Sequence, residues 1–241
     1  MTALVVGATG ATGQLLVKEL LARGEHLRII VRSTEDLADE ITSHENLSVF
    51  RASILDLSDD ELAECVSGCD AVASCLGHNM SFRGLFGPPR RLVTDATRRL
   101  CSAIKANEPR KPVRFVLMNT AGNRNPDADE QLSFRERCVI GLLRLLLPPH
   151  ADNEEAADYL RTRIGQNDEA IQWAALRPDT LIDEAETTQF EVHPSPTQSA
   201  IFDARKTSRI NVSAFMADLI CDDDAWNEWK GKMPVIYNKE L

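Results

Sequence analysis

The sequence predicts an α/β protein with a Rossmann-type, doubly wound parallel sheet in a three-layer α/β/α arrangement. One observation is the regular alternation of strand-length apolar runs with segments of helical periodicity, which is typical of a parallel sheet covered by helices on both faces. The other is a glycine-rich turn, GATGATG, directly after the first apolar run. Because 241 residues fall within the size of one domain, we expect residues 1–241 to form a single unit.

The predicted elements follow one another in a regular order. The first helix, 11–24, places Leu16 and Leu20 on one face, and Gly24 is a typical residue for a helix end. The apolar runs predict strands at 2–6, 26–32, 47–52, 70–77, 113–120, 171–178 and 233–238. Further helices are predicted at 90–107, 153–164 and 212–220.

Two stretches interrupt this alternation, at about 121–150 and 183–208. Each follows a predicted strand, so each is expected near the carboxyl edge of the sheet. Open α/β sheets bind their ligands at that edge, and long insertions there often carry function. We therefore expect both insertions to form the substrate-side wall.

The charge balance and the cysteines restrict the class of protein. A formal net charge of −10 argues against binding to nucleic acid or to an anionic membrane surface. The six cysteines form no C-x-x-C pair and join no histidine cluster, so we expect reduced thiols, no metal site and a cytoplasmic location. The chain begins at once with a strand rather than a leader, and its longest apolar run, 138–149, is too short for a membrane span.

The three glycines of the turn have separate predicted tasks. Gly7 can adopt the backbone angles of a sharp strand-to-helix turn, Gly10 allows a pyrophosphate to approach the backbone, and Gly13 lets the helix pack closely on the sheet. The helix N-terminus offers N–H donors to the phosphates. The predicted cradle consists of Gly7, Thr9, Gly10, Ala11, Thr12 and Gly13.

The end of the second strand predicts which dinucleotide is bound. An acidic residue about 20 positions after the glycines would bind a ribose 2′-hydroxyl. This chain has Arg32 there, followed by Ser33, and a guanidinium can pair with a 2′-phosphate. We therefore expect NADP(H) in preference to NAD(H). The alternative is that Arg32 is only a solvated charge at a strand end.

Residues after the third and fourth strands are also expected near the cofactor. Asp56, next to Leu57, could accept a hydrogen bond from an adenine amino group or could cap a helix. Cys75, Leu76 and Gly77 follow the fourth strand, where small residues would let the chain run close to the ribose and nicotinamide.

Together these motifs resemble the atypical short-chain dehydrogenase/reductase superfamily. The similarity is greatest to its NAD(P)H-binding branch, which includes flavin- and biliverdin-reductase-like and NmrA-like proteins. It rests on GATGATG, VRS, the position of Asp56, DAVASCLG, RFVLMNTAG and WAALRPDTLID, and it covers residues 2–183. The resemblance implies the Rossmann fold, the NAD(P)H cofactor, and Asn119, Arg177 and Pro178 at the nicotinamide end.

The chain departs from this resemblance at the catalytic end. Many relatives use a Tyr-x-x-x-Lys pair before the sixth strand, in which the Lys lowers the pKa of the Tyr. Here Tyr159 is followed four residues later by Arg163, and the positions expected by register hold Asn153 and Pro149. We interpret the pair as absent. Relatives similar to flavin reductases carry a His two residues after Pro178, where this chain has Thr180.

A site without this pair suits hydride transfer to a flavin, a quinone or a similar conjugated small-molecule acceptor, because such reactions mainly require two rings to be aligned. Thr120 and His78 are the candidate catalytic residues; the alternatives are an ordinary strand-end Thr and a structural loop His. The loop after His78 carries Arg83, Arg90 and Arg91, which could hold an anionic substrate or simply be solvated.

A second hypothesis is a non-catalytic regulator that senses NAD(P)(H) and binds a protein. It rests on the same missing catalytic groups and on the apolar segment 138–147. That segment could equally wall the substrate site or form a homo-oligomer contact.

Overall fold

The computed structural model describes residues 1–78, 87–128, 130 and 133–239, and every structural statement below concerns these residues. Their main sheet has the strand order β3–β2–β1–β4–β5–β6–β10–β8. In chain order the strands of this sheet are β1 (Thr2–Val6), β2 (His26–Val31), β3 (Leu47–Arg51), β4 (Ala71–Ser74), β5 (Val113–Met118), β6 (Ile171–Pro178), β8 (Phe190–His193) and β10 (Val235–Asn238).

The predicted doubly wound sheet is confirmed. All neighbouring pairs are parallel except β10 and β8. The strand order changes direction between β1 and β4, so the carboxyl ends of these two strands form the switch point at which such sheets bind ligands.

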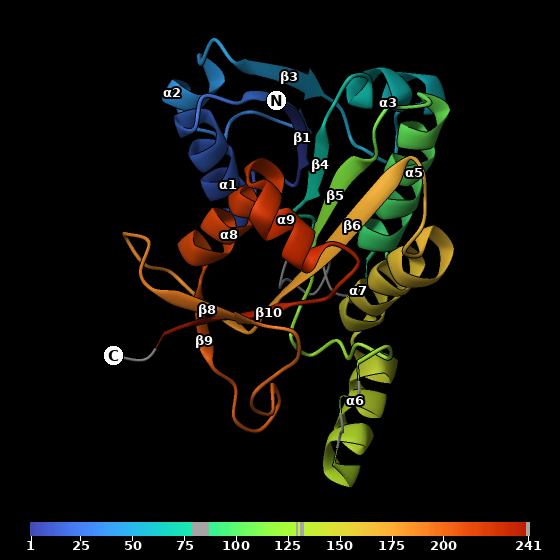
Figure 1. The fold of residues 1–241 in the computed structure, drawn as a ribbon, viewed down its shortest axis with the longest axis vertical. Helices are drawn as coiled ribbons and strands as arrows, with labels where there is room; N and C mark the ends of the chain where they lie inside the picture. The colour runs from blue at the N-terminus through green and yellow to red at the C-terminus, as the bar shows by residue number, and fades with distance from the viewer. Residues whose placement is uncertain (79–86, 129, 131–132, 240–241) are drawn as a thin grey trace.

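Helices cover both faces of the sheet, and Figure 1 shows α1, α8 and α9 on one side and α3, α5 and α7 on the other. The helices are α1 (Ala11–Ala22), α2 (Asp39–Thr42), α3 (Asp59–Val66), α5 (Leu92–Ala106), α6 (Phe134–Leu146), α7 (Pro148–Tyr159), η1 (Leu160–Ile164), α8 (Arg209–Cys221) and α9 (Asp223–Trp229).

The core has two layers because successive side chains of a strand point to opposite faces. In β1, Val5 packs with Leu16 of α1 and Met216 of α8. Its neighbour Leu4 packs in the other layer, with Leu62 of α3 and Leu100 of α5. The inner strands are therefore buried on both faces, which explains why they read as continuous apolar runs.

Both insertions contain regular structure. The segment 183–208 includes β8, which adds an antiparallel edge to the sheet, and β9 (Lys206–Ser208), which pairs with β7 (Thr180–Ile182). The segment 121–150 includes α6, which extends beyond the sheet in Figure 1. Helix α7 begins at Pro148, five residues before the predicted start, because prolines are well tolerated in a first helical turn. In the described part of the chain, no helix is long and apolar enough to cross a membrane.

The end of α5 provides a test of local backbone strain. Glu108, just after the C-cap Asn107, has φ +46°, a left-handed conformation that favours glycine. We predict that Glu108→Gly raises the free energy of unfolding by roughly 1 kcal/mol, measured by urea denaturation. Glu186→Gly, at an exposed loop position without positive φ, is the control and should not stabilise the protein.

Candidate functional site

The turn between β1 and α1 can accommodate only glycine at two positions. Gly7 has φ +76°, and a Cβ atom built there would lie 2.5 Å from the carbonyl carbon of Cys75. A Cβ on Gly13 would collide with the backbone of Gly7 and Ala8. At these two positions the turn packs so closely against neighbouring backbone that no side chain fits.

The N-terminus of α1 opens onto this space. Gly10 is the N-cap residue and provides no side-chain cap, so the first N–H groups of the helix remain available to a phosphate. The Gly10 N–H itself closes the turn by donating to the Gly7 carbonyl at 3.0 Å. Absence of side chains and availability of donors are the two properties that a bound pyrophosphate requires.

A cavity of about 210 Å³ lies at this turn, along the carboxyl ends of β1, β2, β3 and β4. Seven of the predicted cofactor residues line it: Gly7, Thr9, Gly10, Arg32, Cys75, Leu76 and Gly77. Pro89 and Leu92, at the start of α5, close another side. The structure thus brings together residues that are up to 86 positions apart in the sequence, because parallel strands end at one edge.

The segment after β3 contributes different residues from those predicted. Ser53, Ile54 and Leu55 line the cavity, whereas Asp56 is exposed and Leu57 packs against the core. The alternative role for Asp56, a helix N-cap, is wrong, because Ser58 is the N-cap residue of α3 and accepts a hydrogen bond from the Glu61 N–H. The position of Ser53, Ile54 and Leu55, directly after the third strand, is the sequence feature that could have identified them as lining residues.

Other predicted cofactor residues lie outside the cavity lining. Ala11, Thr12 and Gly13 belong to the first turn of α1, where Thr12 is buried. Ser33 accepts a hydrogen bond from the Glu35 N–H at 3.1 Å and shapes the turn after β2. The Cys75 thiol is in the lining, but burial raises its pKa to about 12, so it is a neutral group rather than a thiolate nucleophile.

His78 lies beside this cavity in a buried pair with Asp152 of α7. Its Nε2 is 2.7 Å from the Asp152 Oδ2. The same carboxylate accepts hydrogen bonds from the N–H groups of Val93 and Thr94 at 2.8 and 2.9 Å. Burial alone would raise the pKa of Asp152, but the hydrogen bonds from His78, Thr94 and Val93 outweigh burial and lower it. The Asp152 carboxylate of α7 therefore contacts both the N-terminus of α5 and the segment after β4.

Asn119 and Thr120 follow β5, one strand beyond β4 in the sheet. The Asn119 amide donates to the Asn153 carbonyl of α7 at 2.8 Å, and its oxygen accepts from the Thr120 N–H at 2.9 Å. Thr120 lines a second cavity, of about 300 Å³, together with His150, Asp179 and Thr180. Asn119 thus fixes α7 against the end of β5, where Thr120 faces open space.

The structure does not bring Arg177 to either cavity. Its side chain is fully buried, and its guanidinium contacts the Glu130 Oε1 at 2.7 Å. It also donates to the carbonyls of Met233 and Asn123 at 2.7 and 2.8 Å. The Pro178 carbonyl accepts from the Ala121 N–H at 2.9 Å. Both residues thus anchor the insertion that begins at Ala121.

A third cavity, of about 430 Å³, lies where the two insertions meet. One wall includes Glu136 and Ile140 of α6, and the other is the segment 195–201. The Ser199 hydroxyl donates to the Glu136 Oε1 at 2.5 Å and links the walls. This cavity shares Gly122, Ala200 and Ile201 with the one that holds Thr120, so both insertions border the space beyond β5 and β6.

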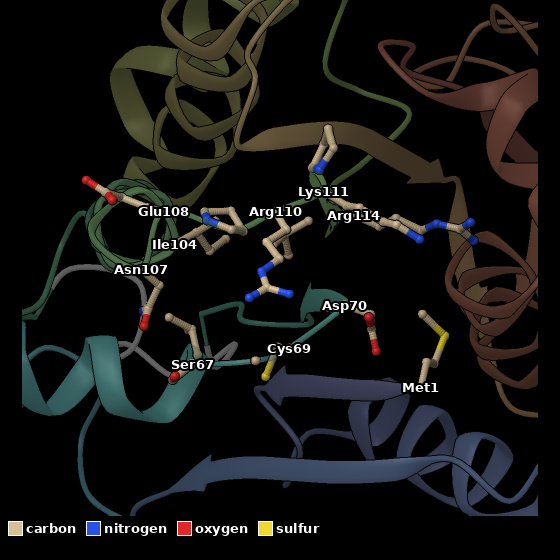
Figure 2. Close-up of a pocket in the computed structure, with 15 residues that line it drawn as sticks. Met1, Ser67, Cys69, Asp70, Ile104, Asn107, Glu108, Arg110, Lys111 and Arg114 are labelled. Atoms are coloured by element: carbon tan, nitrogen blue, oxygen red, sulfur yellow. The ribbon is translucent and has the colours of Figure 1, made fainter.

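The largest of these cavities, about 660 Å³, lies at the opposite edge of the sheet. It is lined by residues that precede β4 and β5, including Asp70 and Arg110. Figure 2 shows Arg110 reaching toward the segment that carries Ser67 and Cys69. Because this is the amino edge of the parallel strands, it has none of the helix N-termini that bind a dinucleotide phosphate.

Tyr159 is half-buried in the layer of α5 and α7. Burial raises the pKa of its phenol, with the Cys101 thiol adding to the effect. The Arg98 guanidinium lies 5.6 Å from the ring centroid, whereas Arg163 is exposed.

The loop predicted to hold an anionic substrate is only partly described. Arg83 lies outside the described residues. Arg91 is paired with Glu155 at 2.7 Å. In the part of the chain that the structure covers, no group of three His, Cys, Asp or Glu side chains could hold a metal ion.

The fold and the glycine turn together define a nucleotide-binding Rossmann protein. The chain belongs to the NAD(P)H-binding family, whose model matches residues 7–223. This agrees with the branch that the sequence motifs resemble. None of the curated proteins matches the sequence significantly.

Solved structures share the fold at low sequence identity. A short-chain dehydrogenase/reductase from Veillonella parvula DSM 2008, in complex with NADP, has a TM-score of 0.71 and 18% identity, over 98% of this chain and 94% of that one. An anaerobilin reductase from Escherichia coli O157:H7 has a TM-score of 0.69 and 19% identity, over 100% and 98%. A protein of Streptococcus pneumoniae TIGR4, assigned provisionally as an NADH-flavin reductase, has a TM-score of 0.67 and 17% identity, over 99% and 100%.

The carboxylate shared by α5, α7 and His78 is open to a direct test. Asp152→Ala removes the acceptor for two helix N–H groups and leaves His78 buried without this partner. We predict a loss of about 2–4 kcal/mol in the free energy of unfolding, measured by urea denaturation. Asp158→Ala, an exposed carboxylate on the same helix, should cost less than about 0.5 kcal/mol; equal losses would contradict the assigned role.

Proposed function

We propose that the protein is an NADP(H)-dependent reductase of a flavin, a quinone or a similar conjugated acceptor. The observation that carries the proposal is the arrangement of two cavities along one sheet edge. The first combines the glycine cradle with Arg32, and the second begins at Thr120. A cofactor that extends from β2 toward β5 would place its two ends in these two spaces.

Arg32 supports NADP(H) over NAD(H). It lines the cradle cavity at the end of β2, and none of the described lining residues is acidic. A guanidinium stabilises a 2′-phosphate by paired, charge-assisted hydrogen bonds. The carboxylate that would favour an unphosphorylated ribose is missing from the described lining.

The residues of the chain would bind and orient rather than exchange protons through a tyrosine. The α1 N-terminus would hold the pyrophosphate, and Leu76 and Gly77 would border the ribose and nicotinamide. Bound NADPH supplies the hydride. Tyr159 is a poor proton donor, because its pKa is raised by burial and Arg163 is exposed. A conjugated acceptor suits such a site, since its ring system takes up the electrons.

Two of the similar structures support this class of acceptor by their names, which specify reduction of anaerobilin and of flavin. Both are under 20% identical to this chain, so they support the choice of assay rather than a substrate.

Turnover is the first test. We predict that the purified protein oxidises NADPH when FMN, riboflavin or a benzoquinone is added, measured by the loss of absorbance at 340 nm. Each acceptor needs a protein-free control for direct reduction. Bound NADPH should also raise the unfolding temperature. Cofactor binding without turnover of any acceptor would refute the reductase proposal.

Cofactor choice is tested at Arg32. We predict that Arg32→Glu weakens NADPH binding by about 10- to 100-fold through loss of a charged hydrogen-bond pair and added repulsion. NADH binding should change by less than about threefold. Dissociation constants from cofactor fluorescence measure both. Arg110→Glu, at the opposite edge of the sheet, is the matched control; equal weakening of both cofactors in Arg32→Glu would contradict 2′-phosphate recognition.

A regulator that senses NADP(H) is the second candidate. It is favoured by three exposed apolar side chains on α6, Phe134, Leu142 and Leu146, which are 77%, 54% and 54% accessible. A protein partner could cover this surface. Cofactor binding without turnover, in the assay above, is the result that would favour this role.

A further inference from the structure

The cavity beyond β5 contains a histidine that sequence reasoning did not select. His150 lies in the first turn of α7 and lines this cavity with Thr120, Asp179 and Thr180. A Cβ built on Gly122 would be 3.7 Å from both the His150 Cε1 and the Thr120 Oγ1. The imidazole and the hydroxyl therefore approach the same point in the cavity from two elements.

The two ring nitrogens of His150 have different surroundings. Nε2 is buried and lies 3.4 Å from the Glu154 Oε1, without a well-aligned hydrogen bond. Nε2 lies beside the carboxylate, and Cε1 is the ring atom near Gly122. We therefore infer that Nδ1, the other nitrogen bonded to Cε1, is the one that meets a molecule in the cavity. A ring with one nitrogen beside a carboxylate and the other able to reach the reactants is an arrangement that suits proton transfer by histidine.

Glu154 is itself held in place. Arg144 of α6 donates to its two carboxylate oxygens at 2.5 and 3.0 Å. Burial raises the pKa of Glu154, but the contacts with His150 and Arg144 outweigh burial and lower it. The carboxylate therefore stays ionised beside the His150 Nε2.

Asp179 is the other titratable group that lines the cavity. Burial raises the pKa of Asp179, and this effect outweighs the hydrogen bonds from the N–H groups of Arg205 and Thr180, which lower it. Its Oδ2 accepts from the Arg205 N–H at 3.0 Å, so this oxygen serves the turn before β9. His150 also lines the cavity, and within the described residues its ring makes no hydrogen bond to the backbone.

We infer that His150 is the proton donor to the electron acceptor, an inference that rests on the proposed reductase function. The acceptor is a quinone or flavin whose oxygen or nitrogen becomes anionic when it takes up a hydride and its two electrons. The His150 Nδ1–H bond breaks and that proton forms the new O–H or N–H bond. The Nε2–H stays directed at Glu154, and water returns a proton to Nδ1. Thr120 contacts the same acceptor.

The experiment compares His150→Ala with His193→Ala. His193 is a matched control, because its Nε2 is also buried and 3.4 Å from a carboxylate, that of Glu191, yet it lies on β8 and does not line the cavity that holds Thr120. We expect His150→Ala to lower kcat for benzoquinone by about 100-fold or more, with NADPH affinity within twofold of wild type. Added imidazole should restore kcat at least tenfold. His193→Ala should keep the wild-type kcat.

A binding measurement provides a readout that needs neither cofactor nor turnover. 4-Nitrophenolate resembles the anionic form of a reduced quinone, and its affinity can be measured by calorimetry. We expect at least tenfold weaker binding to His150→Ala and no more than twofold change in His193→Ala.

Three results would overturn the inference in distinguishable ways. If wild type reduces benzoquinone and His150→Ala retains kcat within threefold, His150 is not the donor and the reductase function stands. A loss of kcat that imidazole does not restore, with unchanged 4-nitrophenolate binding, would indicate a structural role. If wild type reduces no acceptor, both the proposed function and this inference fail.

Discussion

The arrangement of the site depends on the close approach of two backbone segments, the β1–α1 turn and the end of β4. Gly7 is in a left-handed conformation, and no side chain fits between it and Cys75. This contact sets the depth of α1 against the sheet and directs its N-terminus at the cavity. A single methyl group at Gly7 or Gly13 would displace the helix, so binding of a phosphate and packing of the fold rest on the same atoms.

A buried carboxylate, that of Asp152, fixes the positions of α5 and α7 next to the glycine turn. Asp152 supplies the N-terminal cap that α5 lacks, because the N-cap residue Arg91 gives no side-chain hydrogen bond. The same helix, α7, is tied to β5 through Asn119 and carries His150. The position of His150 in the cavity that holds Thr120 is therefore determined in part by hydrogen bonds made beside the cavity at the glycine turn, and one helix, α7, connects the two spaces.

Features that depend on local sequence spacing can be predicted from the sequence. Contacts between residues far apart in the chain cannot. The glycine turn, the strands and Arg32 follow from short patterns that the structure reproduces. Arg177 was misplaced because its partner, Glu130, lies 47 positions away inside an irregular insertion without periodicity. The pair formed by His78 and Asp152 spans 74 positions and has no local signal either. His150 likewise has no local signal, because only the folded chain places it in one cavity with Thr120.

The buried pair of Arg177 and Glu130 joins the 121–150 insertion to the sheet. Removing two charges from water costs several kcal/mol, so such a pair is weak support for stability. Its hydrogen bonds to Met233 and Asn123 are specific in direction, however, and they hold the start of the 121–150 insertion against β6. These contacts thus fix where the insertion leaves the sheet, while α6 and the segment 195–201 form the outer walls of the cavity between the two insertions. A substitution in these walls would then change the proposed acceptor site without disturbing the glycine turn, because the described residues that form the walls do not line the cavity at that turn.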